Sequence, residues 1–247
     1  MPAPLVTVVV PVLHDTPALS ALLAWRGDHD DASPAVAWVV VNGDAADASV
    51  ASLRATHPDV TWLDSAPGRG VQLGEGARRA TGRWLLFLHA DTRLPREWLQ
   101  EVTLAARASS YEWGCFQLQL DSAAWQARLI EWAVRLRVRL LRLPYGDQAM
   151  FFRRLTLERW GGVPPQPVME DVALAITFGR RGAPYRSSRR AVTSARRWER
   201  DGWWRRSARN LSLLLQYLLG ASPDRLSGAY QPERGRPVAA GSTSKER

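Results

Sequence analysis

Cysteine and lysine are almost missing from this sequence. Cys115 is the only cysteine in 247 residues, so no intramolecular disulfide can form, and a reducing compartment is expected. Lys245 is the only lysine, so nearly all of the positive charge comes from arginine. No uncharged apolar run reaches the length of a membrane span, and no basic region precedes the N-terminal stretch LVTVVVPVL, as a signal peptide would require. We therefore expect a cytoplasmic protein.

Positive charge is abundant instead. The net charge is +9 at pH 7, while the hydrophobic content of 46% is ordinary for a globular protein. The sign favours an anionic partner, such as a nucleotide, a nucleic acid or a lipid headgroup, and arginine suits bidentate phosphate contacts. Charge alone is equally compatible with an arginine-rich surface that has no binding role.

Strand and helix patterns alternate through the first half of the chain. Apolar, β-branched runs predict strands at 6–12, 36–43, 60–63 and 83–91, and periodic segments predict helices at 17–26, 45–57, 68–82 and 95–108. This order predicts an α/β fold with a mostly parallel central sheet flanked by helices. Ligands of such sheets bind at the carboxyl ends of the strands, where polar side chains collect here. Those side chains are Asn42, Asp64, His89 and Asp91.

The fourth of these strands ends in an unusual way, because RWLLFLHADTRLP turns from five apolar residues to His89 and Asp91. Side chains two apart on a strand point to the same side. We therefore expect His89 and Asp91 to aim together at one point beyond the strand.

The second half predicts a strand at 113–121, a helix within 123–143 with one stripe of arginines, a strand near 191–197 and an apolar helix around 203–219. Acidic residues follow apolar runs at Asp147 and at Glu170-Asp171, as at Asp91. Taken singly, each is explained as a cap or turn residue, and Glu170-Asp171 also suits a helix start. Their joint arrangement is what favours a functional site.

Several stretches together resemble a known family over about residues 5–230. They are VVVPVLHD, VVVNGDAAD, GRGVQLGEGA, LLFLHADT, YGDQAMFFRR, MEDVAL and TSARRWE. The chain resembles the family 2 glycosyltransferases of the GT-A fold, and most of all a bacterial subgroup described as selenodomain-associated transferases. The resemblance implies one domain over 1–230, with a nucleotide-binding half (1–110) and an acceptor and catalytic half (111–230). The tail at 231–247 is rich in Gly, Pro, Ser and charge, and we expect it to be disordered.

The resemblance implies a donor site built from several separate motifs. Pro11 and Asp15 fall where such enzymes hold the base, and Asn42 and Asp47 fall in the second nucleotide motif. Asn42 replaces the usual first acid there, so base identity is open. Arg69 would face the diphosphate from a helix N-terminus, which itself attracts anions. A second departure is Gly74, which stands where the family has asparagine.

The family's metal motif, Asp-X-Asp, is His-Ala-Asp in this chain. Asp91 matches the acid that holds a divalent metal on the donor diphosphate, His89 replaces the first acid, and the small Ala90 lets a ligand approach the backbone. Mg²⁺ binds few carboxylates plus substrate phosphates, so one carboxylate suffices, while an imidazole tilts the site towards Mn²⁺. His89 could equally contact sugar or phosphate, or be a satisfied polar residue at a strand end.

The resemblance also implies the catalytic groups. Asp171 matches the general base of inverting members, with Glu170 orienting it or binding acceptor. Asp147 and Gln148 would line the acceptor side. Further residues would close over the diphosphate, although the last could instead pack in the core: Arg196, Arg197 and Trp198.

Residues 180–209 hold eleven arginines against two acids, ahead of the apolar helix. Aromatic and basic residues beside leucines are typical of an interfacial helix, which would suit a lipid-linked acceptor at the inner face of a membrane. Alternatively, the leucines pack on the core and the arginines face water.

The leading hypothesis is transfer of a sugar, with inversion and metal assistance, from a UDP- or GDP-linked donor to a hydroxyl acceptor. Three alternatives stay open: a nucleotidyltransferase or diphosphate hydrolase, an inactive relative, and a basic protein that binds nucleic acid or a membrane surface. Nucleic acid is not expected as a partner, because it leaves Asp91, Asp147 and Asp171 without a role.

Overall fold

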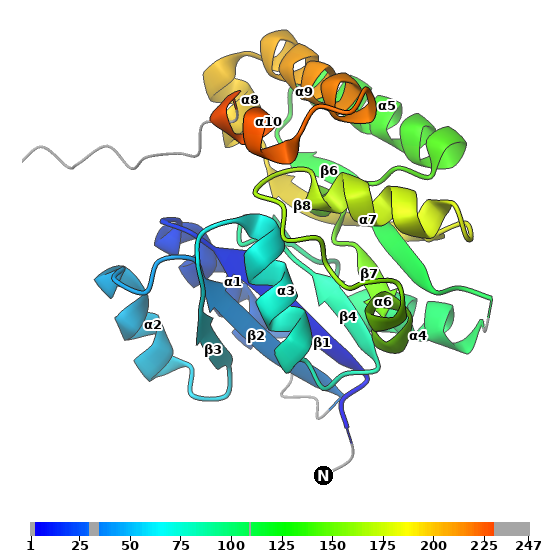
Figure 1. Ribbon diagram of the computed structural model, residues 1–247. Coiled ribbons are helices and arrows are strands. Elements are labelled where there is room, and N and C mark those ends of the chain that lie inside the picture. The colour runs from blue at the N-terminus through cyan, green and yellow to red at the C-terminus, as the bar shows by residue number, and fades with distance from the viewer. Residues whose placement is uncertain (1–2, 30–34, 109, 230–247) are drawn as a thin grey trace, which may run out of the picture.

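The apolar, β-branched runs of the sequence form the inner strands of one sheet (Figure 1). The computed structural model describes residues 3–29, 35–108 and 110–229. In that part of the chain, eight strands lie in the order β3-β2-β1-β4-β7-β6-β8-β5. They are β1 (Val6–Val12), β2 (Val36–Asn42), β3 (Thr61–Asp64), β4 (Trp84–Phe87), β5 (Thr92–Arg93), β6 (Trp113–Asp121), β7 (Phe151–Arg153) and β8 (Tyr185–Ser194).

The sheet is mixed. β1 runs parallel to β2 and β4, and β2 runs parallel to β3. β7 then lies antiparallel between β4 and β6, while β6 is parallel to β8. Four of the seven pairings between described strands are parallel. The predicted α/β fold is therefore confirmed, with antiparallel β7 joining the two halves of the chain into one sheet.

Helices cover both faces of the sheet, because strand side chains alternate between two cores. Val9 and Val41 pack on one side with residues of α3, α5 and α7, whereas Val8 and Val10 pack on the other with α1 and α4. The helices are α1 (Thr16–His29), α2 (Ala51–Thr56), α3 (Arg69–Arg79), α4 (Trp98–Arg107), α5 (Trp125–Leu141), α6 (Arg154–Arg159), α7 (Glu170–Gly179), α8 (Arg196–Asp201), α9 (Trp203–Leu218) and α10 (Pro223–Ala229). Two short 3₁₀ turns are η1 (Ala48–Val50) and η2 (Gly146–Gln148).

Helix α3 lies unusually close to β1. A Cβ atom on Gly76 would clash with the side chain of Val9, and one on Gly70 would clash with the backbone at Pro164. Only glycine permits both approaches. This packing fixes the N-terminal end of α3, and with it Arg69, near the ends of the central strands.

Two strand predictions need correction. β4 ends at Phe87 rather than at residue 91, and residues 89–92 form a turn in which the Thr92 N–H donates to the His89 carbonyl at 3.0 Å. β8 begins at Tyr185 rather than near residue 191, and residues 196 and 197 belong to α8. The sequence does not indicate the start of β8, because serine and arginine occupy its exposed positions and no apolar strand pattern results.

The predicted tail at 231–247 lies outside the described residues, and the division of 1–230 into two halves stays a prediction. No helix in the described parts of the chain is both long enough and apolar enough to span a bilayer.

Candidate active site

One cleft opens at the carboxyl ends of β1 and β4. It consists of an outer chamber of about 540 Å³ and an inner chamber of about 100 Å³. Pro11 near the end of β1 and Asp15 after it line the outer chamber, and Asp147 and Asp171 line the inner one. The residues that line both chambers are Arg69, His89, Asp91, Val168, Arg197, Arg206 and Asn210. The two chambers are therefore one continuous site.

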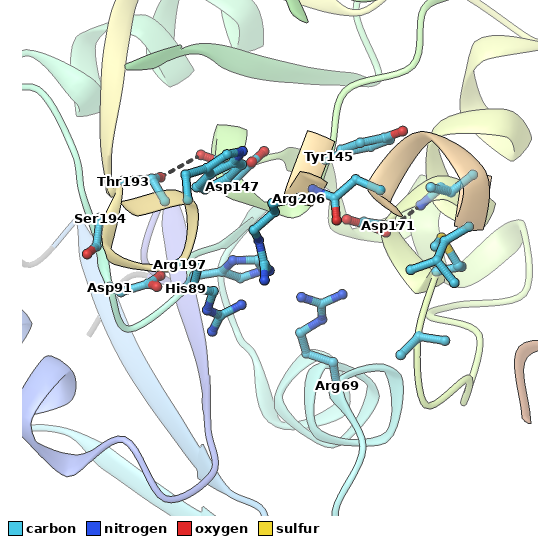
Figure 2. Close-up of a pocket in the computed structure, with 16 residues that line it drawn as sticks. Arg69, His89, Asp91, Tyr145, Asp147, Asp171, Thr193, Ser194, Arg197 and Arg206 are labelled. Atoms are coloured by element: carbon cyan, nitrogen blue, oxygen red, sulfur yellow. Dashed lines mark hydrogen bonds between the residues drawn. The ribbon is translucent and has the colours of Figure 1, made fainter. Parts of the chain in front are cut away.

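His89 and Asp91 both face this site, as the sequence predicted, but through a turn rather than through strand alternation (Figure 2). Burial lowers the pKa of His89 to about 3, helped by the guanidinium of Arg69. The imidazole is therefore neutral near pH 7 and has a nitrogen lone pair available. Ala90, between them, lines the outer chamber, where its small side chain leaves the backbone open to a ligand.

Asp171 is held in a fixed orientation at the start of α7. Its Oδ2 accepts a hydrogen bond of 2.8 Å from the Gly146 N–H, and its Oδ1 accepts one of 2.8 Å from the Val172 N–H. Met169, just before the helix, has a left-handed backbone with φ of 65°, which is uncommon for a residue with a side chain. Such strain is tolerated where the surroundings fix a functional geometry.

Glu170 is fully buried and is not among the described residues that line either chamber. Arg69 Nε lies 2.6 Å from its Oε1. Burial raises the pKa of Glu170 to about 7, although Arg69 beside it favours the ionised form. Glu170 therefore anchors Arg69, which lines both chambers, and its predicted contact with acceptor or with Asp171 stays a prediction.

Asp147 brings another carboxyl group to the inner chamber. Burial raises its pKa to about 6, against the opposing effect of Arg137 and with further increases from Asp171 and Asp91. Its Oδ1 is buried and has no hydrogen-bond partner among the described residues. Buried polar atoms are normally paired, so an unpaired one in a chamber indicates a place for a ligand.

Arginines from three elements point into the same space (Figure 2). Arg69 comes from the first turn of α3, Arg197 from α8 and Arg206 from α9. The guanidinium of Arg206 lies over the ring of Trp198, 5.5 Å from its centroid, and pairs with Asp201 at 2.8 Å. Such a cluster creates a positive potential suited to phosphate groups.

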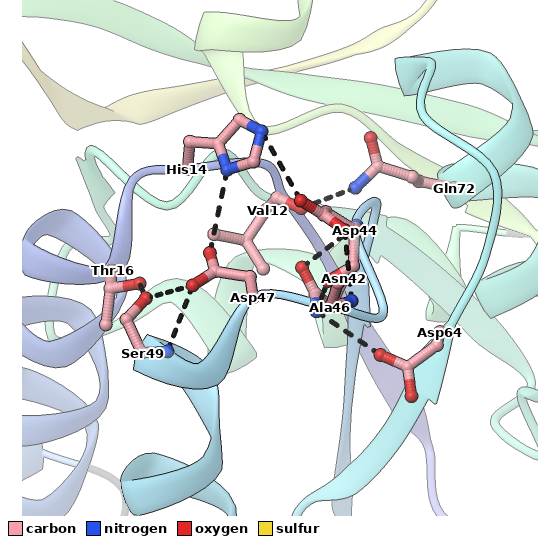
Figure 3. A network of polar contacts seen from close by, with 10 residues as sticks. All are labelled: Val12, His14, Thr16, Asn42, Asp44, Ala46, Asp47, Ser49, Asp64 and Gln72. Carbon is pink, nitrogen blue, oxygen red and sulfur yellow. Dashed lines mark hydrogen bonds and ion pairs between the residues drawn. The ribbon is translucent and has the colours of Figure 1, made fainter. Parts of the chain in front are cut away.

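Asn42, at the end of β2, and Asp47 make their hydrogen bonds to the loop that follows this strand (Figure 3). The Asn42 amide donates to the Asp44 carbonyl at 2.6 Å, and Asp47 accepts from the Ser49 N–H at 3.0 Å. His14 lies 3.7 Å from the carboxylates of both Asp44 and Asp47. Neither Asn42 nor Asp47 is among the described residues that line the chambers, so the structure gives them a part in shaping the loop beside His14.

Three other predicted residues also have distinct places. Gln148 braces its turn, accepting from the Tyr145 N–H at 3.2 Å and donating to the Phe116 carbonyl at 3.1 Å. Arg196 pairs with Asp15 and lies 3.8 Å from Asp91, which orients both acids. Trp198 is buried and lines the inner chamber.

Sequence reasoning missed part of the lining. Tyr145 lines the inner chamber, and the guanidinium of Arg137 lies over its ring, 3.4 Å from the centroid. Three lining residues belong to α9: Arg206, Asn210 and Leu213. Tyr145 adjoins the Gly-Asp-Gln motif and was detectable from it. The α9 residues carried no local signal, because only the tertiary path of the chain brings them to the cleft.

Comparisons with known proteins identify the family and the fold of this chain. The family model "Glycosyl transferase family 2" matches residues 17–155. No curated protein matches the chain. Among solved structures, the mannosyltransferase PcManGT from Pyrobaculum calidifontis, in complex with GDP-Man and Mn²⁺, superposes with a TM-score of 0.59 at 20% identity, covering 92% of this chain and 68% of that one.

S. aureus TarS 1-349, in complex with UDP-GlcNAc, superposes with a TM-score of 0.55 at 14% identity, covering 76% of this chain. The match spans about half of the TarS chain, 55%. Because the family model matches more than half of the sequence, the chain belongs to glycosyltransferase family 2. The fold is that of the GT-A glycosyltransferases. The selenodomain-associated subgroup stays a prediction.

Proposed function

We propose that the protein transfers a sugar, with inversion at the anomeric carbon, from a UDP- or GDP-linked donor to a hydroxyl acceptor. The main support for this proposal is that the two chambers are continuous and share lining residues. An arginine-rich outer chamber large enough for a nucleotide leads into an inner chamber where Asp171 and Asp147 lie beside His89 and Asp91. Two solved structures of the same fold were determined with UDP-GlcNAc and GDP-Man.

Asp171 acts as the general base. Its carboxylate takes the proton of the acceptor hydroxyl while the acceptor oxygen forms a bond to the anomeric carbon. The bond from that carbon to the diphosphate oxygen breaks, and the nucleoside diphosphate leaves with the electron pair. Arg69, Arg197 and Arg206 stabilise the charge that develops on the leaving group. Asp147, which lines the inner chamber, contacts the acceptor in this proposal.

The donor set fits a divalent cation, Mg²⁺ or Mn²⁺, that is shared between protein and substrate. Asp91 supplies a carboxylate and His89 a neutral imidazole, and the described residues include no group of three or more His, Cys, Asp or Glu that could hold a metal by themselves. Mg²⁺ and Mn²⁺ sites that hold phosphates need few protein ligands. A cation held there would offset the charge of the diphosphate.

The acceptor is a hydroxyl compound, for which a lipid-linked alcohol at the inner face of a membrane is our leading candidate. The test is to incubate the protein with UDP-GlcNAc or GDP-Man, with Mn²⁺ or Mg²⁺, and with simple or lipid-linked alcohols. We expect acceptor-dependent release of UDP or GDP and a product of opposite anomeric configuration to the donor. A product that retains the donor's configuration, or donors that stay intact with every acceptor, would contradict the proposal.

A further inference from the structure

Helix α5 has an apolar stripe on its solvent side as well as on its core side. Its buried residues are Ala127, Glu131, Val134 and Val138. At about 100° per residue, a second row lies on the opposite side of the helix. The residues of that row are Trp125, Leu129, Trp132, Leu136 and Leu140, and all are exposed, with Trp132 at 55% and Leu140 at 67%. Ordinary core packing explains the first stripe but leaves the second unexplained.

Helix α9 repeats the arrangement. Leu213 and Leu214 are buried, so part of the leucine-rich segment packs on the core. Another stripe faces solvent, and it consists of Trp204, Leu211, Leu215 and Leu218, followed by Leu219 after the helix. The two helices lie at the same end of the molecule (Figure 1), and their exposed stripes meet where the rings of Trp125 and Trp204 approach to 5.8 Å. Exposed apolar surface of this extent marks a contact with a partner or a membrane.

The exposed charges on the two helices themselves are all positive. Helix α9 contains no acidic residue, and the only acid of α5, Glu131, is buried and accepts from the Leu120 N–H. Arg135 and Arg139 flank the α5 stripe, and Arg205 flanks that of α9. Among the described residues, the ion pairs of these two helices include those of Arg128 with Glu131 and Arg206 with Asp201, and none involves these three arginines.

A pocket of about 400 Å³ opens beside the α5 stripe, between α5 and strands β6 and β8. Trp132 and Leu136 of the stripe line it, and so do three arginines, Arg135, Arg139 and Arg186. Its lining contains no carboxylate. The pocket therefore offers a cationic recess next to exposed leucine and tryptophan, which matches the chemistry of a phosphate headgroup attached to acyl chains.

We infer that the exposed stripes of α5 and α9 dock on a bilayer that contains anionic phospholipid, with the pocket arginines taking headgroup phosphates. Tryptophan and arginine suit the interface, and the leucines insert below it. A second copy of the chain fits less well, because self-association through this face would bring the same arginines together. The opposite side of α9 contributes Arg206, Asn210 and Leu213 to the cleft. If the proposed transfer holds, docking thus brings the cleft close to lipid-borne hydroxyl groups.

Vesicle co-sedimentation of the full chain tests this docking without any turnover, so its failure is separate from failure of the proposed function. The probes are vesicles of phosphatidylcholine and of an equimolar mixture of phosphatidylcholine and phosphatidylglycerol. We expect binding to the mixed vesicles that weakens with salt, and little binding to the neutral ones.

Two variants with matched controls locate the surface. Trp132→Ser with Leu136→Ser should weaken binding about tenfold, whereas Leu104→Ser with Leu155→Ser, at exposed leucines on α4 and α6, should not. Arg135→Gln with Arg139→Gln should weaken it about thirtyfold, since one arginine near an anionic surface contributes about fivefold. The control Arg79→Gln with Arg159→Gln removes the same amount of charge away from the stripes. It should weaken vesicle binding less than Arg135→Gln with Arg139→Gln does.

Three results would overturn the inference. The first is that the wild-type chain does not bind the mixed vesicles. The second is that each pair of substitutions weakens binding no more than its matched control. The third is concentration-dependent dimerisation that is abolished by Trp132→Ser with Leu136→Ser, which would assign this face to a second copy of the chain.

Discussion

Asp171 and Gly146 are joined by a hydrogen bond of 2.8 Å from the glycine N–H to the Asp171 Oδ2 atom. The bond links the start of α7 to the turn η2, two segments that both line the inner chamber. The same glycine lies against His89, because a Cβ atom added to it would come within 2.6 Å of the His89 Nε2 atom. One backbone position thus fixes the distance between the proposed base and the proposed metal-binding turn.

Asp171→Asn should abolish transfer while leaving donor binding nearly intact. The asparagine oxygen can still accept from the Gly146 N–H, although the amide nitrogen cannot replace the oxygen that accepts from the Val172 N–H, and the amide cannot take a proton. A fall in kcat of about 10²–10⁴-fold is expected, in line with the loss of a general base. Release of nucleoside diphosphate gives kcat, and calorimetric titration gives donor affinity. Turnover like that of the wild type would remove Asp171 from the role of base.

Gly146→Ala should disturb the site and the fold together. The added methyl group meets His89 at 2.6 Å and Asp171 at 3.4 Å, and overpacking of this kind costs about 1–3 kcal/mol. We expect lower activity and a lower free energy of unfolding by urea. Gly182→Ala is the control, because a Cβ atom there meets nothing within 4 Å. Equal behaviour of the two variants would show that close contact at Gly146 does not matter.

Glu170 should make stability depend on pH. Burial raises its pKa from 4.5 to about 7, so the folded state holds a proton that the unfolded state has released in this interval. Its contribution to stability is therefore lost as pH rises from about 4.5 to 7.

Glu170→Gln removes this dependence, so the stability of the variant relative to the wild type should increase with pH. Urea unfolding at pH 5 and pH 8 measures the difference, with Glu158→Gln as a control at an exposed acid. A relative stability that is constant or falls with pH would contradict the assignment of a raised pKa to Glu170.

Asp91→Asn should weaken the metal dependence of nucleotide binding. Asp91 is the carboxylate proposed to share a divalent cation with the donor diphosphate, and amides are poorer ligands than carboxylates. We expect Mn²⁺ to improve UDP or GDP binding by the wild type, and to improve it much less in the variant. Asp121→Asn, at a carboxylate whose side chain is 64% exposed, should behave like the wild type. The same metal effect in both variants would place the cation elsewhere.

The sequence predicted the first half of the fold well, because its strands are unbroken apolar runs. β1, β2 and β3 lie where their β-branched residues indicated. The antiparallel course of β7 was not predictable locally, since Phe151 and Phe152 fit a buried strand of either direction. The two-residue strand β5 was missed because it exists only through its pairing with β8.

The candidate site was predicted in part for a similar reason. Residues that closely follow a strand or begin a helix, such as Asp91, Arg69 and Asp171, lie in the cleft because the neighbouring element positions them there. Asn42 and Gln148 were placed in the nucleotide and acceptor sites by resemblance, yet their amides satisfy nearby backbone groups. Arg206 and Asn210 depend on the long-range packing of α9, which no local pattern encodes.

The most direct test of the nucleotide-sugar site is a thermal-shift measurement of the wild-type chain with UDP, GDP, CDP or dTDP, each with and without Mn²⁺ or Mg²⁺. A ligand that binds only the folded state raises the melting temperature, and one present at about a hundred times its dissociation constant adds about 2.7 kcal/mol. We predict a clear, metal-dependent rise with UDP or GDP. No rise with any nucleotide in either metal would contradict the assignment of this cleft as a donor site.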